Sequence, residues 1–220
     1  VLSGAGGRRS THPWSLGSAC IVKQDGPSRC QTVRALATWS GALAGLLLIL
    51  IGSLLPAALL VPLPLTVVEL PATWQVPALL LCALVCGPRA GVIAAVAYLS
   101  IGLTDLPVFQ SGGGITYVLE PGFGYLAGFI PAAWLTGRLS QQNEMGDLTA
   151  QTGSAIAGLM VLQLCGLLNL GLGALLSRWS VSLPQLIVQY SLGPLPAQLL
   201  LCCGVGLIAV VLRRLLMVPG

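Results

Sequence analysis

Charge is scarce in this chain. Only 7% of its 220 residues are charged, whereas 55% are hydrophobic and the mean hydropathy is +0.91. Soluble domains carry about a quarter charged residues. The composition therefore excludes an ordinary soluble domain and indicates an integral membrane protein.

Lysine and histidine are nearly absent, with Lys23 and His12 as the sole examples. No lysine follows a glycine, so the chain lacks the GxxxxGK[ST] phosphate loop and cannot hydrolyse ATP by that route. The apolar segments also lack the base or paired carboxylates that an intramembrane hydrolase needs. We therefore expect no enzyme, no cofactor and no metal site. The basic residues are scattered singly and form no face for nucleic acid.

Glycine and proline are abundant, at 28 and 15 residues, and many interrupt the apolar runs. Backbone breaks at membrane depth are tolerated only where a bundle or a cavity buries them. This pattern favours a transporter or channel over a simple anchor.

The apolar runs predict an all-α membrane protein, a bundle of six transmembrane helices. The first span is expected from Leu36 to Leu60, with a kink at Pro56. Residues 72–103 are too long for one crossing, and we interpret them as a helical hairpin that turns at "GPRAG". The other spans are expected at 123–135, 154–176 and 196–212.

Residues 1–34 are polar and lack the apolar core of a signal peptide. They are predicted to form a disordered cytoplasmic N-terminal tail, and residues 35–220 to form the membrane domain. An upstream extension from a misassigned start codon is the alternative.

The arginines near the spans predict the orientation. Six crossings place four of them on one side and only Arg178 on the other; the four are Arg89, Arg138, Arg213 and Arg214. Positive residues concentrate on the cytoplasmic side. We therefore expect a multi-pass protein of the cell membrane with both termini in the cytoplasm.

A polar loop at 106–129 stands out between the apolar segments. Gly112, Gly113 and Gly114 can adopt positive φ and let backbone N–H groups approach a ligand, so they could cradle a carboxylate without lysine. Glu120 could accept N–H groups from a ligand or simply favour a helix dipole. Alternatively, the glycines form a flexible turn and the loop aromatics form an interfacial belt.

Neutral polar residues at span positions suit an uncharged polar ring. They are Gln75, Tyr98, Gln163, Asn169 and Gln198. For any one of them the alternative is a hydrogen bond between helices.

A stripe of small residues lies on the first span. Ala37, Gly41 and Gly45 recur at four-residue spacing, so another helix can approach closely. Close packing within the same chain is the alternative to docking of a partner.

The central part of the chain resembles a known family. "GPRAGVIAAVAYLSIGLTDLPVF" (87–109), a glycine cluster and "PGFGYLAGFIPAAWLTGRL" (121–139) look like BioY, the biotin-binding S component of energy-coupling-factor (ECF) transporters. "VPLPLT" and "TWQVPALLL" extend the resemblance to roughly residues 62–139. The resemblance implies a six-helix membrane protein that captures biotin from outside, while a transmembrane T component and two ATPases supply the power.

From the residues and the resemblance together, we expect nine residues to line the ligand site. They are Gln75, Tyr98, Gly112, Gly113, Gly114, Tyr117, Glu120, Tyr125 and Asn169. By the same resemblance, the stripe Ala37, Gly41 and Gly45 is expected to meet the T component.

This chain departs from the family pattern near the last helix. Where the family often shows G-D-x-x-K, the stretch is "SLGPLPAQLL", which keeps Gly193 but has neither the acid nor the lysine. Gln198 is a candidate substitute. Two alternatives stay open: an S component for another vitamin, and a structural or assembly membrane protein whose polar loop is an interface.

Overall fold

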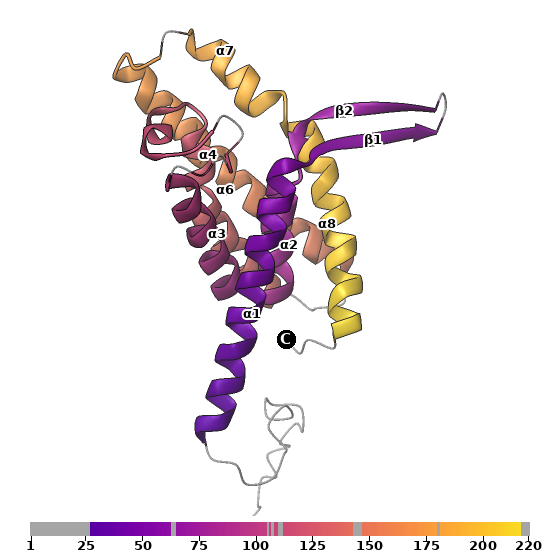
Figure 1. Cartoon of the computed structure of the whole chain (residues 1–220). Coiled ribbons are helices and arrows are strands. Elements are labelled where there is room, and N and C mark those ends of the chain that lie inside the picture. Colours follow the sequence, from indigo (N-terminus) through magenta and orange to yellow (C-terminus); the bar gives the residue numbers. More distant parts are fainter. Residues whose placement is uncertain are drawn as a thin grey trace, which may run out of the picture.

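The computed structural model is a helical bundle with one β-hairpin at its side (Figure 1). It describes residues 27–62, 65–104, 106, 108–109, 112–142, 147–179 and 181–216. The helices are α1 (Pro27–Leu54), α2 (Gln75–Cys86), α3 (Pro88–Leu103), α4 (Phe123–Ala127), α5 (Phe129–Gln142), α6 (Leu148–Leu175), α7 (Leu183–Ile187) and α8 (Leu195–Leu216). A 3₁₀ helix, η1 (Ile115–Leu119), and a π-helical turn, η2 (Val188–Leu192), complete them.

Helix α2 forms the centre of the bundle. It packs against α1, α3, α5, α6 and α8, and ten of its twelve residues are buried. A helix that is apolar on all sides needs such complete cover. The short α2 therefore fixes where the longer helices lie.

The first predicted span ends earlier than expected. Helix α1 stops at Leu54, and the strands β1 (Pro56–Pro62) and β2 (Leu65–Thr73) form an antiparallel hairpin that projects from the bundle (Figure 1). Pro56 starts a strand rather than kinking a helix, because proline has no N–H for the helical ladder. The expected Leu36–Leu60 span was thus wrong at its end, and the largely helical fold carries one β-hairpin that the all-α prediction did not include.

Glycine explains how the hairpin returns to the bundle. A Cβ on Gly52 would lie 2.9 Å from the backbone carbonyl carbon of Trp74, and the Trp74 N–H donates to the Leu55 carbonyl. The end of α1 and the start of α2 therefore meet backbone to backbone.

The turn between α2 and α3 was predicted correctly. Gly87 has φ +86°, which favours glycine, and Pro88 occupies the first turn of α3, where its missing N–H costs nothing. The "GPRAG" sequence therefore encodes the break in the helical hairpin.

Two other predicted elements are subdivided or longer. The span expected at 123–135 is two helices, α4 and α5, and the span expected at 154–176 starts earlier, at Leu148. Asp147 caps that start by accepting from the Thr149 N–H at 3.1 Å. The N-terminal tail prediction falls partly outside the described residues, and α1 begins at Pro27, within the segment assigned to the tail.

Among the described residues, three stretches are long and apolar enough to cross a membrane: Thr32–Leu54, Leu148–Leu175 and Leu183–Leu215. Helices α2 and α3 are apolar but shorter. The large exposed apolar side chains of the three long stretches, which include Leu43, Leu164 and Leu207, suit contact with lipid. The chain is therefore a multi-pass membrane protein.

A buried polar cluster closes the end of the bundle where α2 and α8 finish. Arg213 of α8 is only 5% exposed, and its Nη2 donates to the Leu84 carbonyl and, at 2.8 Å, to Ser140 Oγ. Ser140 in turn donates to Gln151 Oε1 at 2.8 Å. The guanidinium thus satisfies a carbonyl that the end of α2 leaves open, and the cluster joins four helices.

Candidate functional site

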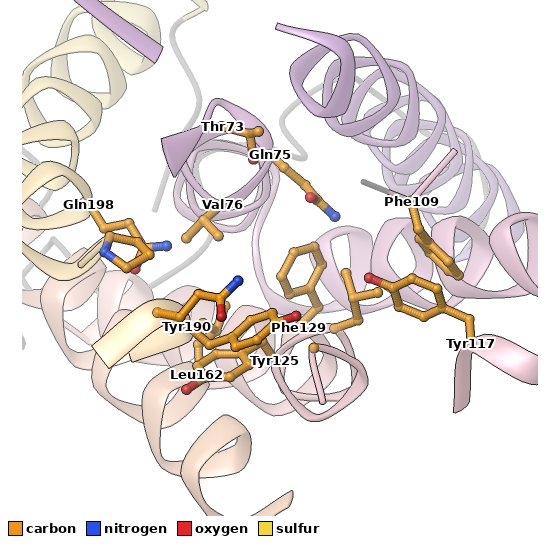
Figure 2. Close-up of a pocket in the computed structure, with 14 residues that line it drawn as sticks. Thr73, Gln75, Val76, Phe109, Tyr117, Tyr125, Phe129, Leu162, Tyr190 and Gln198 are labelled. Atoms are coloured by element: carbon orange, nitrogen blue, oxygen red, sulfur yellow. The ribbon is translucent and has the colours of Figure 1, made fainter. Parts of the chain in front are cut away.

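The principal cavity lies at the opposite end of α2 and α8, where η1, α4 and η2 also converge (Figure 2). Its volume is about 400 Å³, within the range of small-molecule sites. It is lined by Thr73, Gln75, Val76, Phe109, Tyr117, Gly122, Tyr125, Leu126, Phe129, Leu162, Gln189, Tyr190, Pro194 and Gln198. No residue in this set carries a formal charge, so recognition there depends on neutral groups and shape.

Aromatic rings form one wall of the cavity. Phe109 packs against Tyr117, with ring centroids 4.7 Å apart, and against Tyr98 at 5.6 Å in an edge-on arrangement. Tyr98 also stacks on Phe129 at 6.2 Å. Such pairs favour one arrangement of the rings, so the wall is formed before any ligand enters.

Glycines on α3 and α6 make room for this wall. A Cβ on Gly102 would collide with the Phe109 ring, and one on Gly166 would collide with the Tyr125 ring. Tyr125 lies over Gly166 and stacks on Tyr190, with centroids 6.4 Å apart. The shape of the cavity therefore depends on glycine at both positions, because any side chain there would displace a ring.

Amide side chains supply polar groups. Gln75, only 5% exposed at the start of α2, has a buried Nε2 without a hydrogen-bond partner. In Figure 2 its amide is directed toward the same space as the Tyr117 hydroxyl. A buried N–H group without a partner is costly, so Gln75 is a ready donor for a ligand.

Three of the nine predicted site residues line the cavity: Gln75, Tyr117 and Tyr125. Two others stand behind it. Tyr98 is fully buried, and its hydroxyl donates to the Val108 carbonyl at 3.0 Å. Asn169 donates to the Pro121 carbonyl at 3.1 Å, so it holds the chain at the entrance to α4.

The glycine cluster has a different place from the one expected. None of Gly112, Gly113 and Gly114 lines the cavity. The N–H of Gly112 donates to the Phe109 carbonyl at 3.1 Å, and that of Gly114 donates to the Gly102 carbonyl at 2.9 Å. With φ of +119° and +94°, these two glycines turn the loop back onto α3. The N–H groups of Gly112 and Gly114 therefore hold the loop that positions Phe109, and in this structure they are not presented to the cavity.

Glu120 is also separate from the cavity. It is exposed and lies in a second, shallower hollow with Leu119, Pro121, Arg178, Trp179, Val181 and Leu186. The helix it precedes, α4, has only five residues. The structure thus places Glu120 beside the site rather than in it.

The sequence analysis missed Gln189 and Tyr190. Both lie in η2, where the Gly193 N–H donates to the Val188 carbonyl at 2.8 Å, the five-residue spacing of a π turn. Such turns recur at functional sites. Gln198, the candidate substitute near the last helix, does line the cavity. A π turn leaves no periodic signal in sequence, whereas Gln198 was marked by its polarity within an apolar run.

The small-residue stripe packs mainly within the chain. A Cβ on Gly41 would lie 2.9 Å from Cys86 Cβ, and one on Gly45 would lie 3.3 Å from Ala94 Cβ. Ala37 is exposed. Both glycines are therefore covered by α2 and α3, which is the alternative that the sequence left open.

The fold and cavity define a multi-pass membrane protein with a cavity of ligand size at one end of its helical bundle. The structure is similar to a crystal structure of the S-component for biotin from an ECF-type ABC transporter, with a TM-score of 0.63 over 86% of this chain and 95% of that chain. The sequence identity is 17%, so this likeness concerns the fold. The BioY family matches residues 30–217, and the chain belongs to that family.

Relatives match shorter segments. A probable biotin transporter BioY from Lysinibacillus sphaericus is 45% identical over 84 residues, which are 38% of this chain and 41% of that protein. The biotin transporter BioY from Thermotoga maritima is 35% identical over 97 residues, 44% of this chain and 56% of its own. The alignments thus span about half the length of these two curated relatives.

Proposed function

We propose that this chain is the substrate-binding subunit of a biotin importer. The observation that supports this proposal most directly is a cavity of about 400 Å³ with aromatic walls and neutral polar groups, in a chain of the BioY family. Biotin combines an apolar bicyclic ring with a cyclic urea and a carboxylate. Apolar walls with a few placed hydrogen-bonding groups suit such a ligand.

The chain captures biotin and leaves energy supply to partners. It carries no GxxxxGK[ST] loop, so a T component and ATPase subunits of an ECF complex would drive reorientation. Binding requires no covalent change of the ligand, and the cavity lining offers neutral amides and phenols rather than a nucleophile paired with a base.

Six crossings fit the order of the helices. They are α1, α2, α3, the α4–α5 pair, α6 and the α7–α8 segment. In this arrangement the cavity opens to the outside, and both termini are cytoplasmic. The positive side chains of Arg89, Arg138 and Arg214 then lie on the cytoplasmic side. Reporter fusions to the C-terminus, read as cytoplasmic fluorescence or periplasmic phosphatase activity, test this orientation.

Equilibrium binding of labelled biotin to the purified protein tests the proposed function. Saturable binding tighter than micromolar is expected. Binding of another labelled vitamin, with no binding of biotin, would instead select an S component of different specificity. Absence of binding to any vitamin would favour a structural or assembly role.

A further inference from the structure

A chain of hydrogen bonds stands behind the cavity. Ser191 Oγ donates to Gln163 Oε1 at 2.7 Å, and Gln163 Nε2 donates to Gln198 Oε1 at 2.9 Å. Ser191 and Gln163 are 3% and 4% exposed and do not line the cavity, whereas Gln198 does. The chain therefore connects η2 and α6 to one side chain at the ligand site.

This connection determines which amide atom of Gln198, the nitrogen or the oxygen, is presented to the cavity. Its Oε1 is occupied by Gln163, so its Nε2 remains available, and Figure 2 shows that nitrogen on the side of the cavity. An amide donates at one atom and accepts at the other. Gln198 therefore offers a donor rather than an acceptor.

The two amides in this hydrogen-bond chain are coupled, because the orientation of Gln163 determines the orientation of Gln198. If Gln163 were reversed, its Oε1 would face Gln198, which would then turn its own oxygen toward the cavity. The Ser191 hydroxyl can donate or accept, so it does not forbid either direction. The group at position 163 consequently controls what a ligand meets at position 198, although Gln163 itself does not line the cavity.

We propose that Gln163 is a positioning residue that makes Gln198 a hydrogen-bond donor for an acceptor oxygen of the ligand. The inference rests on the proposed function, in which the ligand is biotin. Two oxygens of biotin have this chemistry, the urea carbonyl and the carboxylate. The neutral amide chain acts in the region where the family's acid and lysine are missing from this sequence.

Gln163→Glu tests the direction of the chain. An ionised carboxylate only accepts, so it takes the Ser191 O–H and a Gln198 N–H, and Gln198 then presents its oxygen. A protonated carboxyl still donates and keeps the original direction. The affinity of Gln163→Glu for biotin should therefore fall at least tenfold as the pH is raised, while the unmodified protein shows no such fall. Gln163→Leu breaks the chain without reversing it and should show a pH-independent loss.

Ligand analogues identify the oxygen. 2-Iminobiotin replaces the urea oxygen by a donor, and biotin amide replaces the carboxylate. At high pH, the ratio of the affinity for biotin to the affinity for one of the two analogues should be at least tenfold smaller in Gln163→Glu than in the unmodified protein. A change confined to 2-iminobiotin supports the inference and assigns the donor to the urea, and a change confined to biotin amide supports it and assigns the donor to the carboxylate.

Several outcomes would overturn the inference. Identical pH profiles and preferences in Gln163→Glu and Gln163→Leu would reduce Gln163 to a packing role, provided that the unmodified protein binds biotin. No biotin binding by the unmodified protein would overturn the proposed function and the inference with it. If Gln163→Glu does not fold, Gln163→Leu is used, which removes the donor to Gln198 Oε1; an unchanged biotin affinity and an unchanged preference between biotin and both analogues would then contradict the inference.

Discussion

Helices α2 and α8 carry polar groups at both ends, but the two ends use them differently. At the cavity, Gln75 and Gln198 are neutral and face open space. At the other end, the Leu84 carbonyl and Arg213 meet in a closed cluster. The two groups on α8 are 15 residues apart, which is about 22 Å along a helix. One end presents neutral polar groups to a cavity, and the other joins four helices through the contacts of Arg213 Nη2 and Ser140, while Arg213 Nε, Arg213 Nη1 and Gln151 Nε2 have no hydrogen-bond partner among the described residues.

Glycines at the two ends of the bundle also differ in what they contact. At the closed end, a Cβ on Gly137 would lie 2.5 Å from the backbone nitrogen of Pro88, so α5 touches the α2–α3 turn directly. At the cavity, Gly166 accommodates the ring of Tyr125, a side chain that can move. Substitutions at the two ends should therefore separate loss of stability from loss of binding.

The largest effect is expected for Gly137→Ala. The added methyl meets backbone rather than a flexible side chain, so α5 must shift from Pro88. Overpacking of this kind costs about 1–3 kcal/mol or more. The midpoint of thermal unfolding, measured by size-exclusion chromatography in detergent, should fall clearly.

Gly153→Ala is the matched control for Gly137→Ala. Gly153 also lies within a helix, but a Cβ there meets nothing within 4 Å. Alanine favours helix over glycine, so this variant should hold or raise the unfolding midpoint. Equal losses in the two variants would contradict the close contact between α5 and Pro88.

Arg213→Ala should have the next largest effect on stability. The variant leaves the Leu84 carbonyl and Ser140 without their charged donor, and one hydrogen bond to a charged group contributes about 1.5–3 kcal/mol. A lower unfolding midpoint with retained biotin affinity below that midpoint is expected. Arg214→Ala removes an exposed neighbour of the same charge and should change neither quantity. Loss of biotin affinity in Arg213→Ala at temperatures where it stays folded would disprove the division between the two ends.

Local signals explain what the sequence predicted well. Gly87 and Pro88 mark the α2–α3 turn by their own backbone preferences, and long apolar runs mark α1 and α6. Gln75 and Gln198 were noticeable because amides are uncommon in apolar segments. These features need no knowledge of distant residues.

The missed features depend on contacts between distant parts of the chain. Apolar residues of the β1–β2 hairpin extend the α1 pattern, so hydropathy alone joined them to the first span. Gly112 and Gly114 were interpreted as ligand groups, but they donate to Phe109 and Gly102. These hydrogen bonds form only because the loop folds back onto α3. The sequence of a glycine cluster does not show whether its N–H groups are free for a ligand or bonded within the protein.

Gly166→Ala should reduce binding more than stability. The methyl displaces the Tyr125 ring from α6 into the cavity or away from Tyr190, so biotin affinity should fall about tenfold, which corresponds to about 1.4 kcal/mol. Gly171→Ala, on the same helix with nothing within 4 Å of its Cβ, should leave affinity unchanged. Isothermal titration or filter binding measures both. An unaltered affinity in Gly166→Ala would show that the position of the Tyr125 ring does not shape the ligand site.

The smallest effect is expected for Glu120→Gln, and it sharpens the boundary of the site. Glu120 is exposed and lies in the shallow hollow with Arg178 and Trp179, not in the main cavity. Exposed charges are screened by salt and contribute little, so biotin affinity should change less than about twofold. Arg178→Gln should behave alike, because it removes the opposite charge from the same hollow. A loss of tenfold or more in Glu120→Gln alone would mean that the carboxylate reaches the ligand, and the segment from η1 to α4 would then have to move inward when biotin binds.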